Sequence, residues 1–315
     1  MQKYLSLLSL GLLLIVSDCM GQGLPKAQVS VADIGDTQIL DVPGASIKLV
    51  LMPGERVLPN SALVEWVKND AYVVSIYYGR FPVPRLKLVL TSVAGDHIMQ
   101  GVTFGEDAPL IRIGVGQTAD TDVLTRDWIL VHEMVHLAFP LMARRHHWIE
   151  EGIATYVEPI ARAQVGQLSA EKVWGDMLSD MHQGLPASGD QGLDNTHTWG
   201  RTYWGGAMFC LLADVRLREQ TNNRYGLQHA LRAIDRESGG ITVERSILDT
   251  LKIGDAATGT HVLTDLYRAM ATQATKPDLD ALWQKLGVAQ VDGKILFDDH
   301  APLAKIRLAI LTPLG

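Results

Sequence analysis

The chain has 315 residues, of which 47% are hydrophobic and 20% are charged, and its formal net charge is -7. This composition is typical of a globular protein with a full-sized core and argues against intrinsic disorder. No run of five or more like charges occurs, so nothing indicates a nucleic-acid-binding surface.

Residues 1–21 have the pattern of an export signal. Lys3 supplies a positive charge, and the apolar stretch Leu5–Val16 is shorter than the roughly 20 residues of a membrane-spanning helix. We predict a signal peptide, an exported protein (periplasmic or secreted) and no transmembrane helix in the mature chain. The alternative is a lipoprotein with lipid on Cys19, although Asp18 stands where such signals usually carry a small residue.

Residues 22–120 are predicted to form a strand-rich N-terminal lobe. Alternating or continuous apolar residues predict strands at 47–51, 85–90 and 110–115, and a helical pattern runs from 60 to about 78. This order of one strand, one helix and two strands favours a small mixed sheet with a helix on one face.

Residues 121–315 are predicted to form a mostly helical lobe. One helix begins at about Thr121 and ends before Pro140. Further helices are expected at about 148–163, 202–219, 224–236, 262–272 and 278–286, and helical packing is expected throughout 240–315. The predicted fold class is α+β and zincin-like. Its active site would lie between the two lobes, with the metal-site residues in 122–215.

The segment His132-Glu133-Met134-Val135-His136 is an H-E-x-x-H sequence inside a predicted helix. Positions i and i+4 lie on one face about one turn apart, so both imidazoles can reach a single Zn²⁺. Glu133 points in another direction and can act as general base on a water molecule at the metal. The structural alternative is a surface helix with two solvated histidines, and the apolar residues around the motif argue against it.

A second helical segment, Trp148 to Glu158, follows the first. It matches the W-x-x-E-G-[FI]-A-x-Y-x-E stretch of the gluzincin peptidases, and the chain resembles in particular those like aminopeptidase N. The resemblance implies that Glu151, directly before Gly152, is the third ligand of one zinc ion per chain. Glu158 is then a candidate hydrogen-bond acceptor for a ligand histidine. The alternative is an amphipathic helix whose first turn is acidic and whose Glu158 is solvated.

A third segment matches the Y-x-x-G-A stretch of the same peptidases through Tyr203, Gly206 and Ala207. The resemblance implies that the Tyr203 hydroxyl stabilises the oxyanion, as a neutral phenol can. A buried structural tyrosine is the alternative. His197 and Trp199 precede this segment and could form a wall for the substrate. His146 and His147 could line the cleft, but the favoured interpretation is a polar loop with Arg144 and Arg145.

Two features depart from the family pattern. Only 14 residues separate His136 from Glu151, fewer than in the aminopeptidase N group. Those enzymes also carry a G-x-M-E-N strand whose glutamate holds the free amino group of the substrate. The corresponding edge strand is predicted at Leu110–Gly116, which contains no glutamate. An edge strand can still align an extended peptide. The prediction is therefore a peptidase, with the choice between endopeptidase and exopeptidase left open.

These motifs together predict a zinc-dependent metallopeptidase that acts on peptides or proteins. The predicted ligands are His132, His136 and Glu151, with Glu133 as base and Tyr203 as oxyanion donor. Two alternatives stand beside it. One is a secreted binding protein that keeps a zincin scaffold without turnover. The other is a zinc hydrolase of a non-peptide bond, such as another amide or an epoxide.

Overall fold

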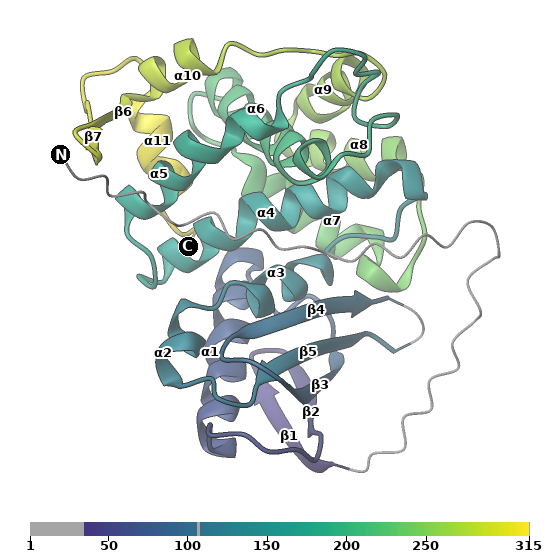
Figure 1. The fold of residues 1–315 in the computed structure, drawn as a ribbon. Helices are drawn as coiled ribbons and strands as arrows, with labels where there is room; N and C mark the ends of the chain where they lie inside the picture. The colour runs from purple at the N-terminus through teal and green to yellow at the C-terminus, as the bar shows by residue number, and fades with distance from the viewer. Residues whose placement is uncertain (1–34, 106–107, 315) are drawn as a thin grey trace. The chain divides into compact units, whose positions relative to one another are not determined.

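The computed structural model of the protein describes residues 35–105 and 108–314 (Figure 1). The predicted signal peptide and Cys19 lie outside these residues. None of the helices in the described part of the chain combines the length and the apolarity that a membrane span requires. The fold is mixed α/β, with one five-stranded sheet followed along the chain by many helices.

The five-stranded sheet is mixed, as the sequence predicts. Its spatial order is β1-β2-β3-β5-β4, in which β2, β3 and β5 run parallel and the two outer strands run antiparallel to their neighbours. The prediction that Leu110–Gly116 is the edge strand is wrong, because β4 pairs with its outer side. The strands are β1 (Asp36–Val42), β2 (Ala45–Leu51), β3 (Arg85–Val93), β4 (Ile98–Phe104) and β5 (Leu110–Gly116).

The edge strand β4 was not predicted because its sequence hides the alternation of a strand. The pairing between β4 and β5 shifts register between Met99 and Val102, which marks a bulge. Gln100 sits in this bulge with a φ of 57°, in the left-handed region. The bulge changes which side chains share a face, so a period of two cannot be read across it.

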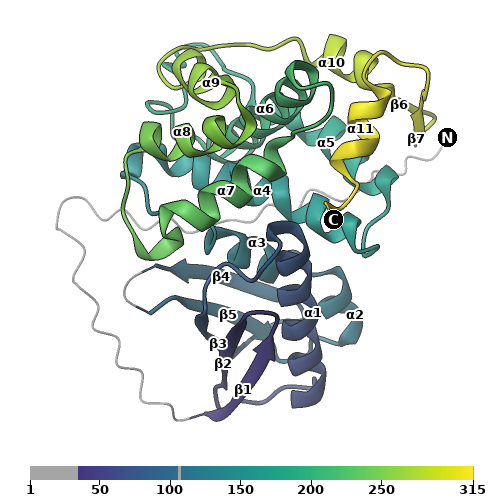
Figure 2. The ribbon, with the colours of Figure 1, turned by 180° about the vertical axis from the view of Figure 1, so that it is seen from behind.

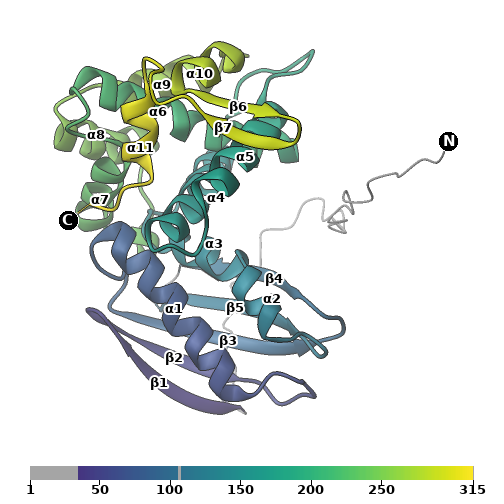
Figure 3. The same ribbon diagram turned by 90° about the vertical axis from the view of Figure 1, so that its left-hand side faces the viewer.

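Helix α1 (Asn60–Tyr78) lies across one face of the sheet, where the sequence predicts a helix (Figures 2 and 3). Its buried side chains include Leu63, Val67 and Val74, spaced as one apolar stripe. The helix ends at Gly79, whose φ of 78° forms a left-handed cap that a residue with a side chain adopts less readily.

The helix predicted from Thr121 to Pro140 is two helices, α2 (Thr121–Arg126) and α3 (Ile129–His136). The carboxylate of Asp127 lies between them and accepts hydrogen bonds from the backbone N–H groups of Ile129 and Leu130, each at 3.1 Å. These are donors that the first turn of a helix leaves free, so Asp127 begins a new helix at this point. The H-E-x-x-H motif therefore sits on a short helix with its own start.

The helices after α3 follow most of the predicted positions. The predicted helices near 148, 202, 224, 262 and 278 are present, α5 was not predicted, and α8 and α11 lie in the segment 240–315, for which only helical packing was predicted. The helices are α4 (His147–Gln164), α5 (Ala170–Asp180), α6 (Gly206–Gln220), α7 (Leu227–Ser238), α8 (Ile247–Thr258), α9 (Val262–Met270), α10 (Leu279–Leu286) and α11 (Ala304–Ile310). Single 3₁₀ turns lie at Arg144–His146, Met181–Gly184 and Gly240–Thr242, and a π-helical turn lies at Arg201–Gly205.

The prediction of helical packing for residues 240–315 is incomplete, because the segment also contains a β-hairpin. Strands β6 (Val288–Val291) and β7 (Lys294–Phe297) pair antiparallel around Asp292 and Gly293, whose φ values are 50° and 77°. Asp-Gly is a strong two-residue hairpin signal because both turn positions need positive φ. The sequence therefore carried the signal for this hairpin.

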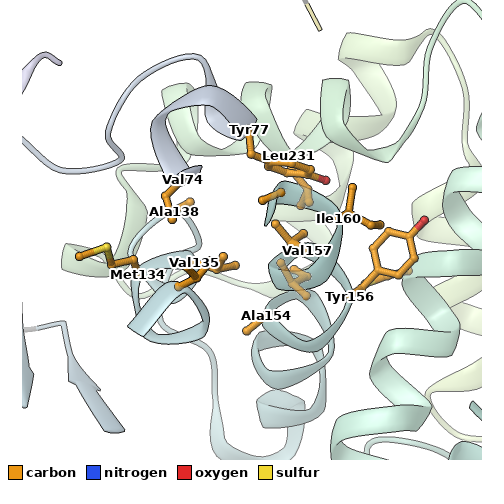
Figure 4. Packing of buried hydrophobic residues seen from close by; sticks show 14 of the residues in the cluster. Val74, Tyr77, Met134, Val135, Ala138, Ala154, Tyr156, Val157, Ile160 and Leu231 are labelled. Atoms are coloured by element: carbon orange, nitrogen blue, oxygen red, sulfur yellow. The ribbon is translucent and has the colours of Figure 1, made fainter. Parts of the chain in front are cut away.

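Buried apolar side chains hold α3 against α4. Figure 4 shows Val135 of α3 facing Ala154 and Val157 of α4. Residues of α1 and α7 belong to the same buried cluster. Because protein interiors are close-packed, this contact fixes the positions of the two helices that carry the predicted metal ligands.

Stability should depend on pH through Asp235, a buried residue of α7 whose carboxylate lies 2.9 Å from Nε of Arg80. Burial raises the pKa of Asp235 to about 6, and Arg80 only partly opposes this. Because the pKa is higher in the folded state than in the unfolded state, the contribution of Asp235 to stability is complete below the unfolded-state pKa. This contribution is lost as the pH rises through about 6. Between pH 4 and 7, ionisation of Asp235 should lower the unfolding free energy of the wild type by up to about 3 kcal/mol. In Asp235→Asn this decrease should be absent.

Urea denaturation of both proteins across this pH range measures the effect. Asp265→Asn is the matched control, because Asp265 forms an ion pair with Arg268 in which both side chains are exposed. Parallel pH profiles for wild type and Asp235→Asn would contradict the prediction.

Candidate metal centre

Two histidines of α3 and one glutamate of α4 come together as the sequence predicts. His132 and His136 are one turn apart on α3, with ring centroids 5.0 Å from each other. Oε2 of Glu151 lies 3.1 Å from Nε2 of His132 and 3.7 Å from Nε2 of His136. One ligand atom from each of the three residues lies within 4.8 Å of the other two.

This donor set fits a zinc ion. Tetrahedral coordination with bonds of 2.0–2.1 Å places neighbouring ligand atoms about 3.3 Å apart. The two separations to Glu151 lie on either side of that value. Two imidazole nitrogens and one carboxylate oxygen are ligands that zinc accepts, and three protein ligands leave a fourth position open. His132 and Glu151 are buried, so their positions are set by the surrounding side chains.

The charge states of His136 and Glu151 also suit a cation. Burial lowers the pKa of His136 to about 4, so its imidazole is neutral at neutral pH. Burial opposes ionisation of Glu151, but the hydrogen bond from His132 and the nearby imidazoles lower its pKa to about 2. Burial disfavours a charge on His132, but Glu151 outweighs it and raises the pKa. A metal ion bound at these residues would displace the proton of His132, because a histidine ligand must be neutral.

Glu133 lies against the edge strand β4, which was not among the predicted site elements. The hydroxyl of Thr103 donates a hydrogen bond of 2.6 Å to Oε2 of Glu133. A Cβ added at Gly101 would come within 2.8 Å of Oε1 of Glu133 and 2.4 Å of Ile129. Burial raises the pKa of Glu133, and His132 and Thr103 oppose the shift. Thr103 thus orients the carboxylate, and Gly101 leaves room for it.

Tyr203 reaches the same centre from the π-helical turn Arg201–Gly205, just before α6. Its ring stacks on that of His132, with centroids 6.4 Å apart. Burial, helped by the negative charges of Glu151 and Glu133, raises its pKa to about 12. The phenol therefore keeps its proton at neutral pH and can donate a hydrogen bond. π-helical turns are frequent at functional sites.

Helices α4 and α6 are in backbone contact immediately beside the candidate ligand on α4. A Cβ added at Gly152 would lie 2.3 Å from backbone atoms of Gly206. A Cβ added at Gly206 would lie 2.1 Å from the carbonyl oxygen of Trp148. These two glycines belong to the W-x-x-E-G and Y-x-x-G-A segments of the sequence. Their role is to bring Glu151 and the turn that carries Tyr203 close together.

The assignment of His146 and His147 to a polar loop is wrong, because His146 is buried and His147 is the first residue of α4. Nδ1 of His146 is buried and lies 2.8 Å from Asp194, which also accepts hydrogen bonds from Nε1 of Trp148 and the hydroxyl of Tyr267. Asp194 therefore anchors the start of α4. His147 is exposed, and its Nε2 lies 3.3 Å from Oε1 of Glu151.

Glu158 has a different partner from those expected. Its carboxylate is buried and accepts a hydrogen bond of 2.8 Å from Nη1 of Arg162, one turn further along α4. The interpretation as a solvated charge is therefore wrong. The structure pairs Glu158 with Arg162 and not with a histidine of the candidate centre.

Comparisons with known proteins identify the fold. No protein-family model matches the chain, and no curated protein matches it. An M1 zinc metallopeptidase from Deinococcus radiodurans matches with a TM-score of 0.52 and 16% identity, over 78% of this chain and 53% of that one. An aminopeptidase N family protein from Idiomarina loihiensis matches with a TM-score of 0.58 and 14% identity, over 85% and 53%.

A mutant of the Deinococcus radiodurans enzyme bound to a Tyr-Ser-Ala substrate also matches, with a TM-score of 0.51 and 15% identity, over 78% of this chain and 53% of that one. The chain thus spans about half the length of each of these solved structures. At these identities the likeness is one of fold: the described chain has a fold similar to that of M1 zinc metallopeptidases.

Proposed function

We propose that this protein is a zinc-dependent metallopeptidase. The observation that carries the proposal is the group of His132, His136 and Glu151, whose donor atoms lie within 4.8 Å of one another on two packed helices. The similarity in fold to zinc metallopeptidases supports it. A bound zinc ion would supply Lewis acidity and make a water molecule more acidic. The export predicted from residues 1–21 remains part of the proposal.

The residues around the ligands suit the remaining steps of peptide hydrolysis. Glu133 takes a proton from the attacking water and passes it to the leaving amine. Thr103 holds the Glu133 carboxylate in one orientation through its hydrogen bond. Tyr203 donates a hydrogen bond to the oxygen of the scissile carbonyl as negative charge develops there.

The outer side of β4 offers a way to align a peptide. β4 is an edge strand, so its free backbone groups can pair with an extended substrate. Its sequence, Ile98–Phe104, contains no acidic residue that could bind a free amino terminus. The proposal is therefore a peptidase without a specified requirement for a free amino end.

Metal analysis together with hydrolysis of a mixed peptide library tests this function. We expect wild-type protein to bind one zinc per chain and to cleave peptides, and His136→Ala to lose both properties. His300→Ala, which removes an exposed histidine far along the chain, is the control and should keep both. Wild-type protein that binds no zinc would refute the metal site. Zinc-loaded protein that cleaves no peptide would favour a binding protein or a hydrolase of another bond.

Tyr203→Phe is expected to lower kcat by about 10²- to 10³-fold, the typical cost of removing one oxyanion donor. The ring that stacks on His132 remains, so zinc content and KM should stay close to the wild-type values. Steady-state kinetics on one cleaved peptide, with zinc measured on the same samples, checks this. An unchanged kcat would assign Tyr203 a structural role.

Thr103→Val is expected to lower kcat by about 10- to 100-fold, because a hydrogen bond to a charged group typically contributes about 1.5–3 kcal/mol. Valine fills nearly the same volume but cannot donate to Glu133. Thr103→Ser keeps the hydroxyl and should recover most of kcat, with KM similar in all three proteins. Equal loss in the serine and valine variants would show that packing, and not the hydroxyl, matters here.

A further inference from the structure

Two of the seven tryptophans have exposed side chains. Both of them, Trp128 at 49% and Trp199 at 53%, lie beside the candidate metal centre. Indole rings bury a large area and usually supply core or interface energy. All seven lie within the described residues, and the five others are buried or half-buried: Trp66, Trp148, Trp174, Trp204 and Trp283. Packing within the protein does not explain why two exposed tryptophans lie beside one candidate metal centre.

The exposed indoles stand at the two ends of a row of rings. The ring of Trp128 meets that of His132 edge-on, with centroids 5.5 Å apart. The ring of Trp199 lies 5.7 Å from that of Tyr203, at an angle of 30°. Tyr203 stacks in turn on His132 at 6.4 Å. The row therefore runs from one exposed tryptophan to the other across a candidate zinc ligand and the candidate oxyanion donor.

The other exposed apolar residues near this region point elsewhere. Gly101 and Thr103 of β4 face Glu133, so the alternating residues Val102 and Phe104 lie on the opposite face of the strand. Phe104 is in addition covered by the guanidinium of Arg112, 5.4 Å from its ring centre. Unlike Val102 and Phe104, Trp128 and Trp199 contact residues of the centre directly.

We propose that Trp128 and Trp199 each bind a large apolar or aromatic side chain of the substrate, as two subsites at the two ends of the row of rings that borders the bond that is cleaved. The inference rests on the proposed peptidase function. An extended peptide that reaches from one indole to the other would follow the row of rings past His132 and Tyr203, which act at the scissile carbonyl in that function. Flat aromatic faces bind apolar and aromatic groups through contact area and ring stacking. A peptide side chain is therefore the occupant that this position favours.

Binding can be measured without turnover in Glu133→Gln protein loaded with zinc. The probes are blocked peptides, acetyl-Ala-Ala-Xaa-Ala-Ala-amide, in which Xaa is Phe, Leu, Ser or Asp. We expect Phe and Leu peptides to bind about 10- to 100-fold more tightly than the Ser peptide, as burial of one such side chain in an apolar pocket gives. In the active enzyme the same preference should appear in kcat/KM and in the residues that flank the cleaved bond.

Substitution of the tryptophans should remove the preference and spare the rest. Trp199→Ala is expected to lower binding of the Phe peptide at least 10-fold and to leave the Ser peptide unchanged. Trp199→Phe should retain most of the preference. Because Trp128 contacts a candidate zinc ligand, Trp128→Phe accompanies Trp128→Ala, and zinc is measured for both. Tyr72→Ala is the control, because Tyr72 is an exposed aromatic residue of α1.

The outcomes separate the two proposals. Peptide cleavage that shows no preference for Phe over Ser, and that persists in both alanine variants, would overturn the subsites and leave the peptidase function standing. Wild-type protein that cleaves no peptide would overturn the peptidase function and the subsites with it. A dimer that dissociates in the alanine variants, with peptide preference unchanged, would assign the tryptophans to contact between copies of the chain and overturn the subsites.

Discussion

Replacement of Glu133 by glutamine is expected to lower kcat by about 10²- to 10⁴-fold, the range that a general base contributes. Glutamine has nearly the same shape as glutamate but cannot take up a proton. The space that Gly101 leaves is unchanged, and the amide oxygen can still accept the hydrogen bond from Thr103. Zinc content and KM should therefore remain close to those of the wild type. Steady-state kinetics, with zinc measured on the same samples, gives the result.

Glu150→Gln is the matched control for this experiment. Glu150 is the acidic neighbour of Glu151 on α4, and its carboxylate contacts the backbone N–H of Met142 and Nδ1 of His147, not His132 or His136. Its substitution should leave kcat and zinc content near the wild-type values. A Glu133→Gln protein that holds zinc and works as fast as wild type would remove Glu133 from the mechanism. Loss of zinc in Glu150→Gln would instead cast doubt on Glu151 as the ligand.

Replacement of Gly152 by alanine is expected to cost more than about 3 kcal/mol of unfolding free energy, at or above the upper end for an overpacked core. The added Cβ would lie 2.3 Å from backbone atoms of Gly206, and a backbone cannot move aside as a side chain can. Helices α4 and α6 must then separate. Because Glu151 directly precedes Gly152, zinc content should also fall. Urea denaturation and metal analysis measure the two effects.

Gly175→Ala provides the comparison, since it makes the same change within a helix. A Cβ at Gly175 of α5 would meet only the side chain of Ile295, at 2.9 Å, which can rotate. Alanine also favours a helix over glycine by about 1 kcal/mol, so this variant should keep wild-type stability and zinc content. Equal stability of the Gly152 and Gly175 variants would show that α4 and α6 have room to adjust.

The part of the site that sequence predicts is the part set by local geometry. The spacing of His132 and His136 fixes their common face on any helix, and Glu151 was assigned through the resemblance of Trp148–Glu158 to the gluzincin motif. These three residues come together as expected. Helix α1 and the mixed character of the sheet were also predictable, because a long apolar stripe and buried strands have clear periods.

The remaining features depend on contacts between distant parts of the chain. Thr103 meets Glu133 across 30 residues, from a strand whose bulge hides its period. Asp194 meets His146 across 48 residues, and nothing in the local sequence of either indicates the other. The break before α3 could have been predicted locally, because an aspartate at the start of a helix is a sequence signal. It was missed because apolar residues at helical spacing occur on both sides of Asp127, which favoured one continuous helix.

The edge strand β4 would serve two purposes in the proposed function. It pairs with β5 along one edge, and Gly101 and Thr103 of β4 position the carboxylate of Glu133. Its other edge is the proposed pairing site for an extended peptide. A substrate that pairs there would pull on the same strand that orients the base, through a bulge that is the least regular point of the sheet. Binding and proton transfer would then be mechanically linked, so poorly fitting peptides would be cleaved slowly even when they are bound.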